Sequence, residues 1–262
     1  MFVSFAKYHG TGNDFIMIDN RSAQLPRYAP DLYAQWCHRR FGVGADGVIL
    51  LQPATGYDFE MVYYNADGHE GSMCGNGGRC AVAFAHKIGF FTTDRTSFLA
   101  TDGAHEAVIA SNGWIWLLMQ PVNKVEQVMG NYVLNTGSPH FVCFTAGIEQ
   151  INVPVEGAKI RYSPPYKEKG INVNFVEPTT NALQVATYER GVEDETFSCG
   201  TGVVASGIAY ALQQNKIGNV SCPIVTKGGT LEVSFTNHQN LFFTDIWLKG
   251  PATHVFDGLI LR

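Results

Sequence analysis

Alternation of apolar and polar positions predicts short strands through much of the chain. The strands expected in the first half are Phe2–Tyr8, Phe15–Asp19, Gly47–Gln52 and Asp58–Tyr64. A helix is expected at Ala29–Phe41, because Pro30 suits a first turn and Gly42 suits the position after a helix end. The pattern therefore predicts a mixture of strands and a few helices.

Two segments repeat one arrangement. In each, a β-rich run leads into a polar loop, then a Cys-Gly-x-Gly sequence, then an apolar run of helical character. The first segment carries Cys74 and the second carries Cys199, with Glu70 and Glu195 four residues before the cysteines. We expect each cysteine to lie at the N-terminus of a helix.

The spacing of these segments predicts an internal duplication. Thr136-Gly137-Ser138 follows Thr11-Gly12-Asn13 by 125 residues, and Cys199 follows Cys74 by the same distance (199 − 74 = 125). Such an offset favours two domains of similar topology. We place them at residues 1–122 and 123–250, and we expect residues 251–262 to return and pair with an early strand.

Composition narrows the class of protein. Hydrophobic residues make up 45% of the chain, and the net charge of -5 comes without a basic cluster, which argues against nucleic-acid binding. No apolar run approaches the roughly 20 residues of a membrane span, and the N-terminus does not resemble a secretory signal. We expect a cytoplasmic protein with no membrane partner.

The six cysteines do not suggest a disulfide scaffold, and none has zinc-ligand spacing. We expect Cys37, Cys80, Cys143 and Cys222 to be small buried fillers. The sequence has neither a GxGxxG nor a GxxxxGK[ST] motif for a nucleotide cofactor. We therefore expect no metal and no cofactor.

The repeated cysteine segments suit proton transfer. A helix N-terminus favours negative charge, so a thiol there should have a pKa below its ordinary value of about 8.5. The neighbouring glycines would let a carboxylate approach the exposed amides. Two such thiols facing one carbon beside a carboxylate could remove a proton from one side and deliver one from the other, which inverts the stereocentre.

Five motifs resemble those of the diaminopimelate epimerase family, in the family's order. They are KYHGTGNDFIMID, NADGHEGSMCGNGGRC, GSPHFV, GINVNFVE and YERGVEDETFSCGTG. The resemblance implies an α/β (α+β) fold of two pseudo-symmetric domains. Each would be a curved, mixed or antiparallel sheet around a central helix, with the active site in the interdomain cleft. It also implies cofactor-independent epimerisation of an amino-acid substrate, LL-diaminopimelate to meso-diaminopimelate, and a homodimer.

The same resemblance assigns residue roles. Cys74 and Cys199 would be the two bases, and His140 and Glu189 would tune them. The substrate would be bound by Asn13, Asn65, Gly75, Asn76, Asn172, Glu189, Arg190, Gly200 and Thr201.

Three departures from the family pattern concern the substrate. Gly47 stands where Gln is common, so a polar contact there is expected to be missing or replaced by water. Ser138 stands where Asn is usual, which shortens a contact with the substrate. The loop from Glu189 to Cys199 is also one residue longer than the common form. A racemase of another amino acid, of the proline or histidine type, stays open as an alternative with the same thiol pair. Asn76 favours diaminopimelate, because proline-type enzymes usually have His there.

Overall fold

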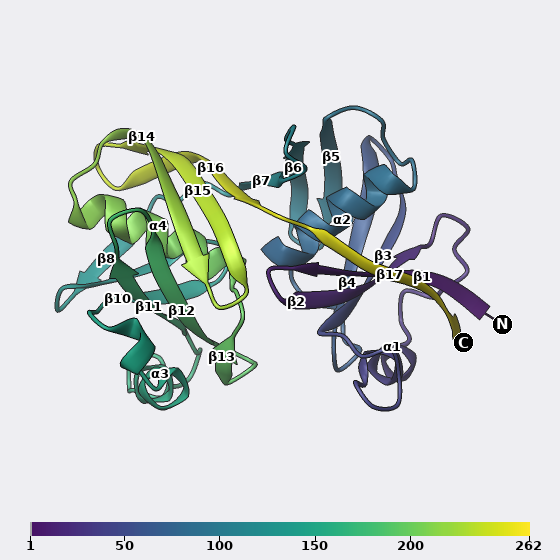
Figure 1. The fold of residues 1–262 in the computed structure, drawn as a ribbon, viewed down its shortest axis with the longest axis horizontal. Helices are drawn as coiled ribbons and strands as arrows, with labels where there is room; N and C mark the ends of the chain where they lie inside the picture. Colours follow the sequence, from purple (N-terminus) through teal and green to yellow (C-terminus); the bar gives the residue numbers. More distant parts are fainter. Residues whose placement is uncertain (1) are drawn as a thin grey trace. The chain divides into compact units, whose positions relative to one another are not determined.

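The computed structural model describes residues 2–262, which form two compact units. One unit comprises the chain up to Leu117 together with Gly250–Arg262, and the other comprises Leu118–Lys249. Each unit is a mixed sheet packed against one long helix, α2 or α4 (Figure 1). The predicted fold class is therefore confirmed.

In the first unit the strands lie in the order β17-β1-β2-β3-β4-β5-β6-β7. The pairs β2–β3 and β4–β5 are parallel and the others are antiparallel. The strands are β1 Phe2–Gly10, β2 Asn13–Asp19, β3 Gly47–Ala54, β4 Tyr57–Asn65, β5 Arg95–Ala100, β6 Gly103–Ile109, β7 Ile115–Met119 and β17 Thr253–Leu261. The helices are α1 Pro30–Cys37 and α2 Gly75–Lys87. Figure 1 shows β17 alongside β1 near the two chain ends.

In the second unit the order is β8-β9-β10-β11-β12-β14-β15-β16, with β13 paired to β12. The strands are β8 Val125–Val128, β9 Asn131–Asn135, β10 Pro139–Phe144, β11 Asn172–Pro178, β12 Leu183–Glu189, β13 Asp194–Thr196, β14 Gly218–Thr226, β15 Gly229–His238 and β16 Phe242–Gly250. The helices are η1 Ile148–Gln150, α3 Val153–Arg161 and α4 Gly200–Gln213. Here β10–β11 and β12–β14 are the parallel pairs, which reproduces the pattern of the first unit.

The two sheets also share one register. Phe15 of β2 lies opposite Gly47 of β3, and His140 of β10 lies opposite Asn172 of β11. Both pairs differ by the offset seen between the cysteines (140 − 15 = 125 and 172 − 47 = 125). The internal repeat is therefore a repeat of strand pairing as well as of sequence.

The helix predicted at Ala29–Phe41 is shorter than expected. It ends at Cys37, because His38 adopts an extended conformation with ψ 119. The following loop folds back on the helix, with Gly44 N–H donating to Trp36 O and Ala45 N–H to Cys37 O. This fold-back brings Arg39 to Asp14 at the start of β2.

Three of the four cysteines predicted to be fillers are buried: Cys37, Cys80 and Cys222. Burial raises the pKa of the Cys37 and Cys80 thiols to about 12 and that of Cys222 to about 11. Cys143 is half-buried, and burial raises its thiol pKa as well. High pKa values make these thiols unreactive near neutral pH.

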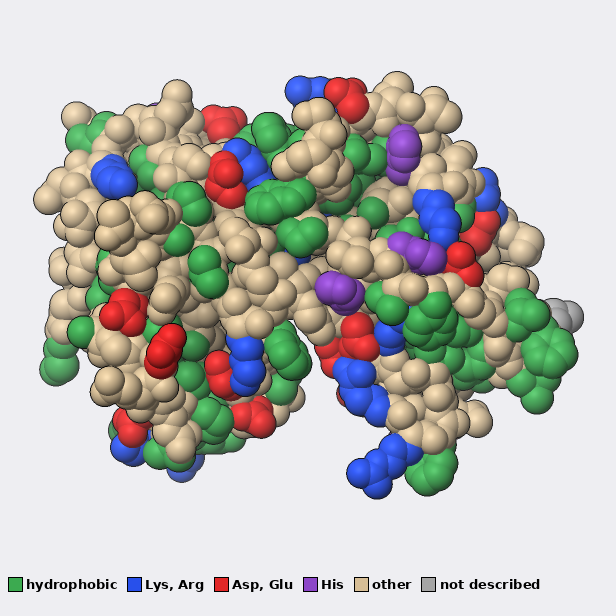
Figure 2. Space-filling model, in the orientation of Figure 1, with side chains coloured by type: hydrophobic (Ala, Val, Ile, Leu, Met, Phe, Trp, Pro, Cys, Tyr) green, Lys and Arg blue, Asp and Glu red, His purple; other side chains and the backbone are tan. Residues whose placement is uncertain are grey.

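Within residues 2–262, no helix is long and apolar enough to cross a membrane. The same residues contain no group of three or more His, Cys, Asp or Glu side chains placed to hold a metal ion. Acidic and basic side chains are interspersed on the face shown in Figure 2, without a broad patch of one sign.

Candidate functional site: two equivalent half-sites

Each of the two cysteines occupies the N-cap of its unit's long helix, as the sequence predicts. Cys74 precedes α2 with φ -110 and ψ 123, and Cys199 precedes α4 with φ -113 and ψ 111. Their carbonyls accept the first helical hydrogen bonds, from Gly78 and Val203. Cysteine is not a preferred capping residue, and neither side chain makes a capping hydrogen bond, so helix capping does not explain its presence at both positions. The N–H groups in the first turn of each helix have no carbonyl of the same helix to which they can donate.

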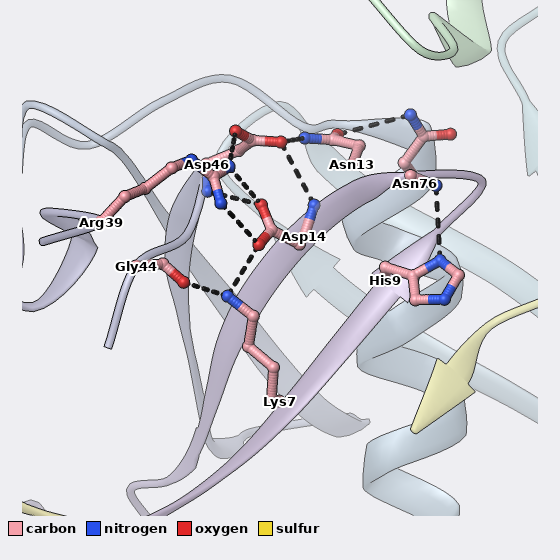
Figure 3. A network of polar contacts seen from close by, with 9 residues as sticks. Lys7, His9, Asn13, Asp14, Arg39, Gly44, Asp46 and Asn76 are labelled. Atoms are coloured by element: carbon pink, nitrogen blue, oxygen red, sulfur yellow. Dashed lines mark hydrogen bonds and ion pairs between the residues drawn. The ribbon is translucent and has the colours of Figure 1, made fainter. Parts of the chain in front are cut away.

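In the first unit, Cys74 contacts Asn13, which lies at the start of β2. Cys74 Sγ is 3.5 Å from Asn13 Oδ1, and Asn76 Nδ2 donates to the same oxygen at 3.3 Å. Asn13 Nδ2 donates to Asp46 Oδ2 at 2.7 Å. Because a carboxylate only accepts hydrogen bonds when ionised, this bond fixes which side of the Asn13 amide faces Cys74. Figure 3 shows the hydrogen bonds that join Asn76, Asn13 and Asp46.

A cluster of two cations and two carboxylates supports Asn13 from behind (Figure 3). Asp14 forms ion pairs with Lys7 at 2.8 Å and with Arg39 at 2.7 Å, and Arg39 also contacts Asp46 at 2.7 Å. Burial alone would raise the pKa of Asp14, but hydrogen bonds from Arg39 and Lys7 outweigh it and lower the pKa to about 2. Asp46 therefore has a fixed position from which to hold the Asn13 amide.

A fully buried arginine lies in the first turns of α2. Arg79 donates to Gly75 O, Asn76 Oδ1, Thr11 Oγ1 and Pro251 O. All four acceptors are neutral, and no carboxylate among residues 2–262 lies within ion-pair distance of it. Burial lowers its pKa to about 10, so the guanidinium stays charged near neutral pH. The fifth residue after Cys199, Val204, is apolar at the equivalent place.

In the second unit, Cys199 belongs to a network of hydroxyl, imidazole and amide groups. Cys199 Sγ is 3.4 Å from Thr201 Oγ1, which is 2.9 Å from His140 Nε2. Asn174 Nδ2 donates to His140 Nδ1 at 3.0 Å. Burial lowers the pKa of His140 to about 3, and the charge of Arg190 acts in the same direction. The imidazole is therefore neutral, with its proton on Nε2.

Close approach of α4 to β11 makes this network possible. A Cβ at Gly202 would lie 2.3 Å from Asn174 Oδ1 and 3.3 Å from His140 Cε1. At Gly77, the equivalent position of α2, the nearest atoms are the flexible ends of Ile49 and Met61 at 3.1 and 3.3 Å. The second Gly of the Cys-Gly-x-Gly sequence is thus more tightly required in the second unit.

Asn172 and Ser138 join the same network. Asn172 Nδ2 donates to Ser138 Oγ at 3.0 Å, and its Oδ1 accepts from the backbone N–H of Arg190 at 2.8 Å. Ser138 Oγ lies 3.1 Å from Thr201 Oγ1. The structure therefore connects four of the predicted residues, Asn172, Ser138, His140 and Thr201, to Cys199.

The other predicted residues lie at strand and helix ends of the same units. Asn65 ends β4 and is exposed, and Glu189 ends β12 next to Arg190. Gly75 and Gly200 open α2 and α4. At Gly47 an added Cβ would lie 2.5 Å from the Tyr63 ring and 2.4 Å from Tyr64 O. A side chain at position 47 would therefore meet the Tyr63 ring and the Tyr64 carbonyl.

Sequence reasoning missed three supporting residues: Asp46, Arg79 and Asn174. Asn174 had a usable signal, because it lies two residues after Asn172 in β11 and so points to the same face of the sheet. Asp46 gave none, since its contact with Asn13 joins segments distant in the chain. Arg79 gave none either, since its contacts with Thr11 and Pro251 also join distant segments.

The buried neutral His140 should make the protein less stable in acid. In the unfolded chain its pKa is about 6.5, whereas in the fold it is about 3. Stability is therefore full above pH 6.5 and falls as the pH drops from there toward 3, by up to about 1.4 kcal/mol per pH unit. Denaturant unfolding of wild type and His140→Gln at pH 7.5 and 5.0 measures this. The wild type should lose more free energy of unfolding between the two pH values, and equal losses would contradict the assignment.

The sequence model described as diaminopimelate epimerase matches residues 5–125 and 132–255. The diaminopimelate epimerase of Flavobacterium psychrophilum is 52% identical over 256 residues, covering 97% of this chain and 98% of that protein. The chain belongs to the diaminopimelate epimerase family. The enzyme of the same name from Chlorobaculum tepidum is 41% identical over 262 residues, covering 96% of this chain and 98% of its own.

Solved structures with the same fold are more distant in sequence. A phenazine biosynthesis protein of the PhzF family from Bacillus anthracis has a TM-score of 0.78 at 13% identity, covering 100% of both chains. A hydroxyproline epimerase from Agrobacterium vitis, with bound trans-4-hydroxy-L-proline, has a TM-score of 0.71 at 13% identity, covering 99% of this chain and 92% of its own. At this identity the likeness concerns the fold alone.

Proposed function

We propose that the chain is an isomerase that converts LL-diaminopimelate to meso-diaminopimelate without a cofactor. One observation carries the proposal: a chain that is 52% identical to a named diaminopimelate epimerase places a cysteine at the N-cap of the long helix in each of two equivalent units. A stereocentre is inverted by an acid and a base that act from opposite faces, and a duplicated thiol site supplies both.

The reaction proceeds by two proton transfers. One thiolate removes the α-proton and becomes a thiol, and the electron pair of the broken C–H bond moves into the adjacent carboxylate. First-turn amides of α2 and α4 stabilise this enediolate-like charge. The other thiol donates its proton to the opposite face of the same carbon and becomes the thiolate. The product leaves with an inverted stereocentre.

The remaining predicted residues would hold the substrate. Gly75, Asn76, Gly200 and Thr201 would contribute the amides that bind the reacting carboxylate. Arg190 is suited to a second carboxylate, because guanidinium binds carboxylates through two parallel hydrogen bonds. Glu189 is suited to an ammonium group, and Asn13, Asn65 and Asn172 can donate or accept. Ser138 and Gly47 contribute less directly, through Asn172 and the Tyr63 ring.

The proposal also includes a cytoplasmic homodimer. Thiols stay reduced in the cytosol, as the reaction requires. Among the described strands of its unit, β17 pairs only with β1. Its exposed apolar side chains are those of Val255, Phe256, Leu259 and Leu261. An apolar edge strand of this kind is suited to pairing with a second copy.

A substrate panel tests the function. The protein is incubated with LL-diaminopimelate, L-proline, trans-4-hydroxy-L-proline and L-histidine, and stereoisomers are separated by chiral chromatography. We expect rapid conversion of LL-diaminopimelate to the meso form and no measurable conversion of the others. Preferential inversion of proline or histidine would replace the proposed substrate while keeping the reaction class.

Asp46 offers a test of the support behind Asn13. In Asp46→Asn the new amide could donate to Asn13, which would turn the Asn13 oxygen away from Cys74. Because a hydrogen bond to a charged group contributes about 1.5–3 kcal/mol, kcat should fall about 10- to 100-fold. KM for LL-diaminopimelate and the melting temperature should change little.

Asp19→Asn is the matched control, because Asp19 belongs to an exposed ion pair with Arg21 in the same unit. Such pairs contribute little, so kcat should be unchanged. If Asp46→Asn kept the wild-type kcat, or if both variants lost it equally, Asp46 would have no positioning role.

A further inference from the structure

The loop that joins β12 to β13 in the second unit contains a glutamate with a strained backbone. β12 ends at Glu189 and β13 begins at Asp194, and these two residues lie opposite each other in the antiparallel pair. Loop 190–193 connects them, and its last residue, Glu193, has φ +59. A residue with a Cβ adopts this left-handed region at a cost, and does so where surrounding contacts hold it there.

The equivalent position of the first unit is a glycine. Gly68 and Glu193 each lie six residues before the cysteine of their unit (74 − 68 = 6 and 199 − 193 = 6). Gly68 has φ +83, so both loops pass through the left-handed region at the same point. Glycine does this without strain. The second unit has a long charged side chain there instead, so the contacts of that side chain must offset the backbone strain.

The Glu193 carboxylate is bound by four groups. Its Oε2 accepts hydrogen bonds from the hydroxyls of Tyr162 and Tyr188, each at 3.0 Å. Its Oε1 accepts from the N–H of Gly191 at 3.2 Å and forms an ion pair with Arg161 Nε at 3.4 Å. Hydrogen bonds to a charged group are stronger than those between neutral groups. The carboxylate therefore ties loop 190–193 to β12, through Tyr188, and to the end of α3, through Arg161 and Tyr162.

These contacts are made to tightly packed secondary structure. Helix α3 packs against β11, β12 and β13 (Figure 1). A Cβ at Gly157 of α3 would lie 2.4 Å from the Tyr188 side chain, so the helix and β12 are in close contact. Tyr188 is buried, and the Arg161 side chain is mostly buried. Loop 190–193 is therefore fixed to the core of its unit rather than to another loop.

The side chain of Arg190 belongs to the same packed cluster. Arg190 Nη1 donates to the carbonyl of Lys169 at 3.1 Å. A Cβ at Gly170 would lie 2.5 Å from Arg190 Cδ and 3.0 Å from Arg161 Cζ, so this glycine packs against both arginine side chains. Because Arg161 also pairs with Glu193, one cluster holds the carboxylate of Glu193 and the stem of Arg190.

The position of the Arg190 guanidinium should matter for binding. Its charge acts on the network around Cys199, because it helps to lower the pKa of His140. The carbonyl of Lys169 is a neutral acceptor, so this bond orients the guanidinium without neutralising its charge. A carboxylate that binds a guanidinium through two parallel hydrogen bonds requires both N–H groups in place. Movement of loop 190–193 should therefore weaken such a contact.

We propose that Glu193 is a positioning residue, which holds loop 190–193 against the end of α3 and thereby sets the affinity for a substrate with a second carboxylate. The proposal rests on the proposed function for the role of Arg190. Glu193 acts through the tyrosine and arginine side chains around it and needs no contact with the substrate. The segment in which this chain is one residue longer than the common family form thus contains its own anchor.

Glu193→Gly separates the anchor from the stability of the fold. It removes the carboxylate but also relieves the left-handed backbone strain, so the melting temperature should change by no more than a few degrees. KM for LL-diaminopimelate should rise about tenfold, because the Arg190 guanidinium is no longer held in place. The kcat should stay within about twofold, since a contact equally strong in the ground state and the transition state affects KM alone.

Hydrogen exchange measures the anchor without any substrate. The N–H of Arg190 donates to Asn172 Oδ1, that of Gly191 to Glu193 Oε1 and that of Glu193 to Glu189 O. These amides should therefore be protected in the wild type. Mass spectrometry of the peptide containing residues 189–197 should show about tenfold faster exchange in Glu193→Gly. Peptides from β14 and β15 should exchange at the wild-type rate.

Met129→Gly is the matched control. Met129 has φ +50 in the turn between β8 and β9 of the same unit, and its side chain is almost fully exposed. The substitution relieves the same kind of backbone strain without removing a polar side chain, so KM and the exchange of residues 189–197 should not change. Glu193→Gln keeps an oxygen that can accept from the tyrosine hydroxyls but loses the charge. Its KM and exchange rate should lie between those of the wild type and Glu193→Gly.

The outcomes separate this proposal from the proposed function. If Glu193→Gly exchanged no faster than the wild type, or raised KM no more than Met129→Gly did, Glu193 would have no positioning role. A fall in kcat at unchanged KM would also overturn the proposal. If the wild type did not convert LL-diaminopimelate, the proposed function would fail together with the substrate part of this proposal. The exchange rates would still decide whether Glu193 holds loop 190–193.

Discussion

Cys199→Ala is expected to lower kcat for LL-diaminopimelate by at least about 1,000-fold, and Cys74→Ala should do the same. A positioned acid or base contributes about 10²- to 10⁴-fold to a proton transfer. Alanine keeps the N-cap backbone geometry, which the side chain does not maintain through a capping bond in either helix. The loss should therefore appear in kcat rather than in folding.

Cys222→Ala is the matched control. Cys222 is a buried thiol in the second unit, and its pKa is raised to about 11 by burial, so it is inert near neutral pH. Its removal should cost some stability and leave kcat near the wild-type value. Steady-state assays of the three variants, with circular dichroism to confirm folding, give the answer. Full turnover by folded Cys199→Ala would contradict the assignment of this thiol.

Gly202→Ala should be strongly disruptive, although alanine is the better helix former. The new Cβ would lie 2.3 Å from Asn174 Oδ1, and both Asn174 and His140 are fully buried. The amide has to move, which breaks the bonds that orient His140 and leaves buried polar groups unsatisfied. We expect a loss of about 2–3 kcal/mol in the free energy of unfolding.

Gly77→Ala is the natural comparison, since Gly77 occupies the equivalent position of α2. Its Cβ would lie close to the flexible ends of Ile49 and Met61, and at ordinary contact distance from the Phe15 ring at 3.5 Å. Removing a helical glycine can gain up to about 1 kcal/mol, which offsets this crowding. Urea unfolding should show a change within about 1 kcal/mol for Gly77→Ala. Equal destabilisation by both substitutions would show that the Asn174 contact does not distinguish the helices.

Local signals predicted the repeat well. A cysteine followed by Gly-x-Gly and an apolar run was enough to place both thiols at helix N-caps. The constant offset of 125 residues between the cysteines (199 − 74 = 125) recurred in the strand register, where Phe15 pairs with Gly47 as His140 pairs with Asn172. These features depend on neighbouring residues, and propensity and turn chemistry therefore capture them.

The errors and omissions arose from contacts that the local sequence pattern does not reveal. The first helix ends at Cys37 instead of Phe41, because the following loop forms backbone bonds to Trp36 and Cys37 rather than continuing the helix. Asp46 and Asn13 approach through the parallel pairing of β2 and β3, which no periodicity reveals. The substrate contacts of Asn65, Glu189 and Arg190 stay predictions.

Isotope labelling tests the two-thiol mechanism most directly. LL-diaminopimelate is converted in D₂O, and at low conversion the recovered substrate and the meso product are analysed for deuterium at the α-carbon. Two bases on opposite faces predict deuterium in the product and none in the recovered LL substrate, because the proton is removed by one thiol and replaced by the other. Deuterium appearing in the recovered substrate as fast as product forms would contradict this account, since a single base would then be returning the label to the face from which it took the proton.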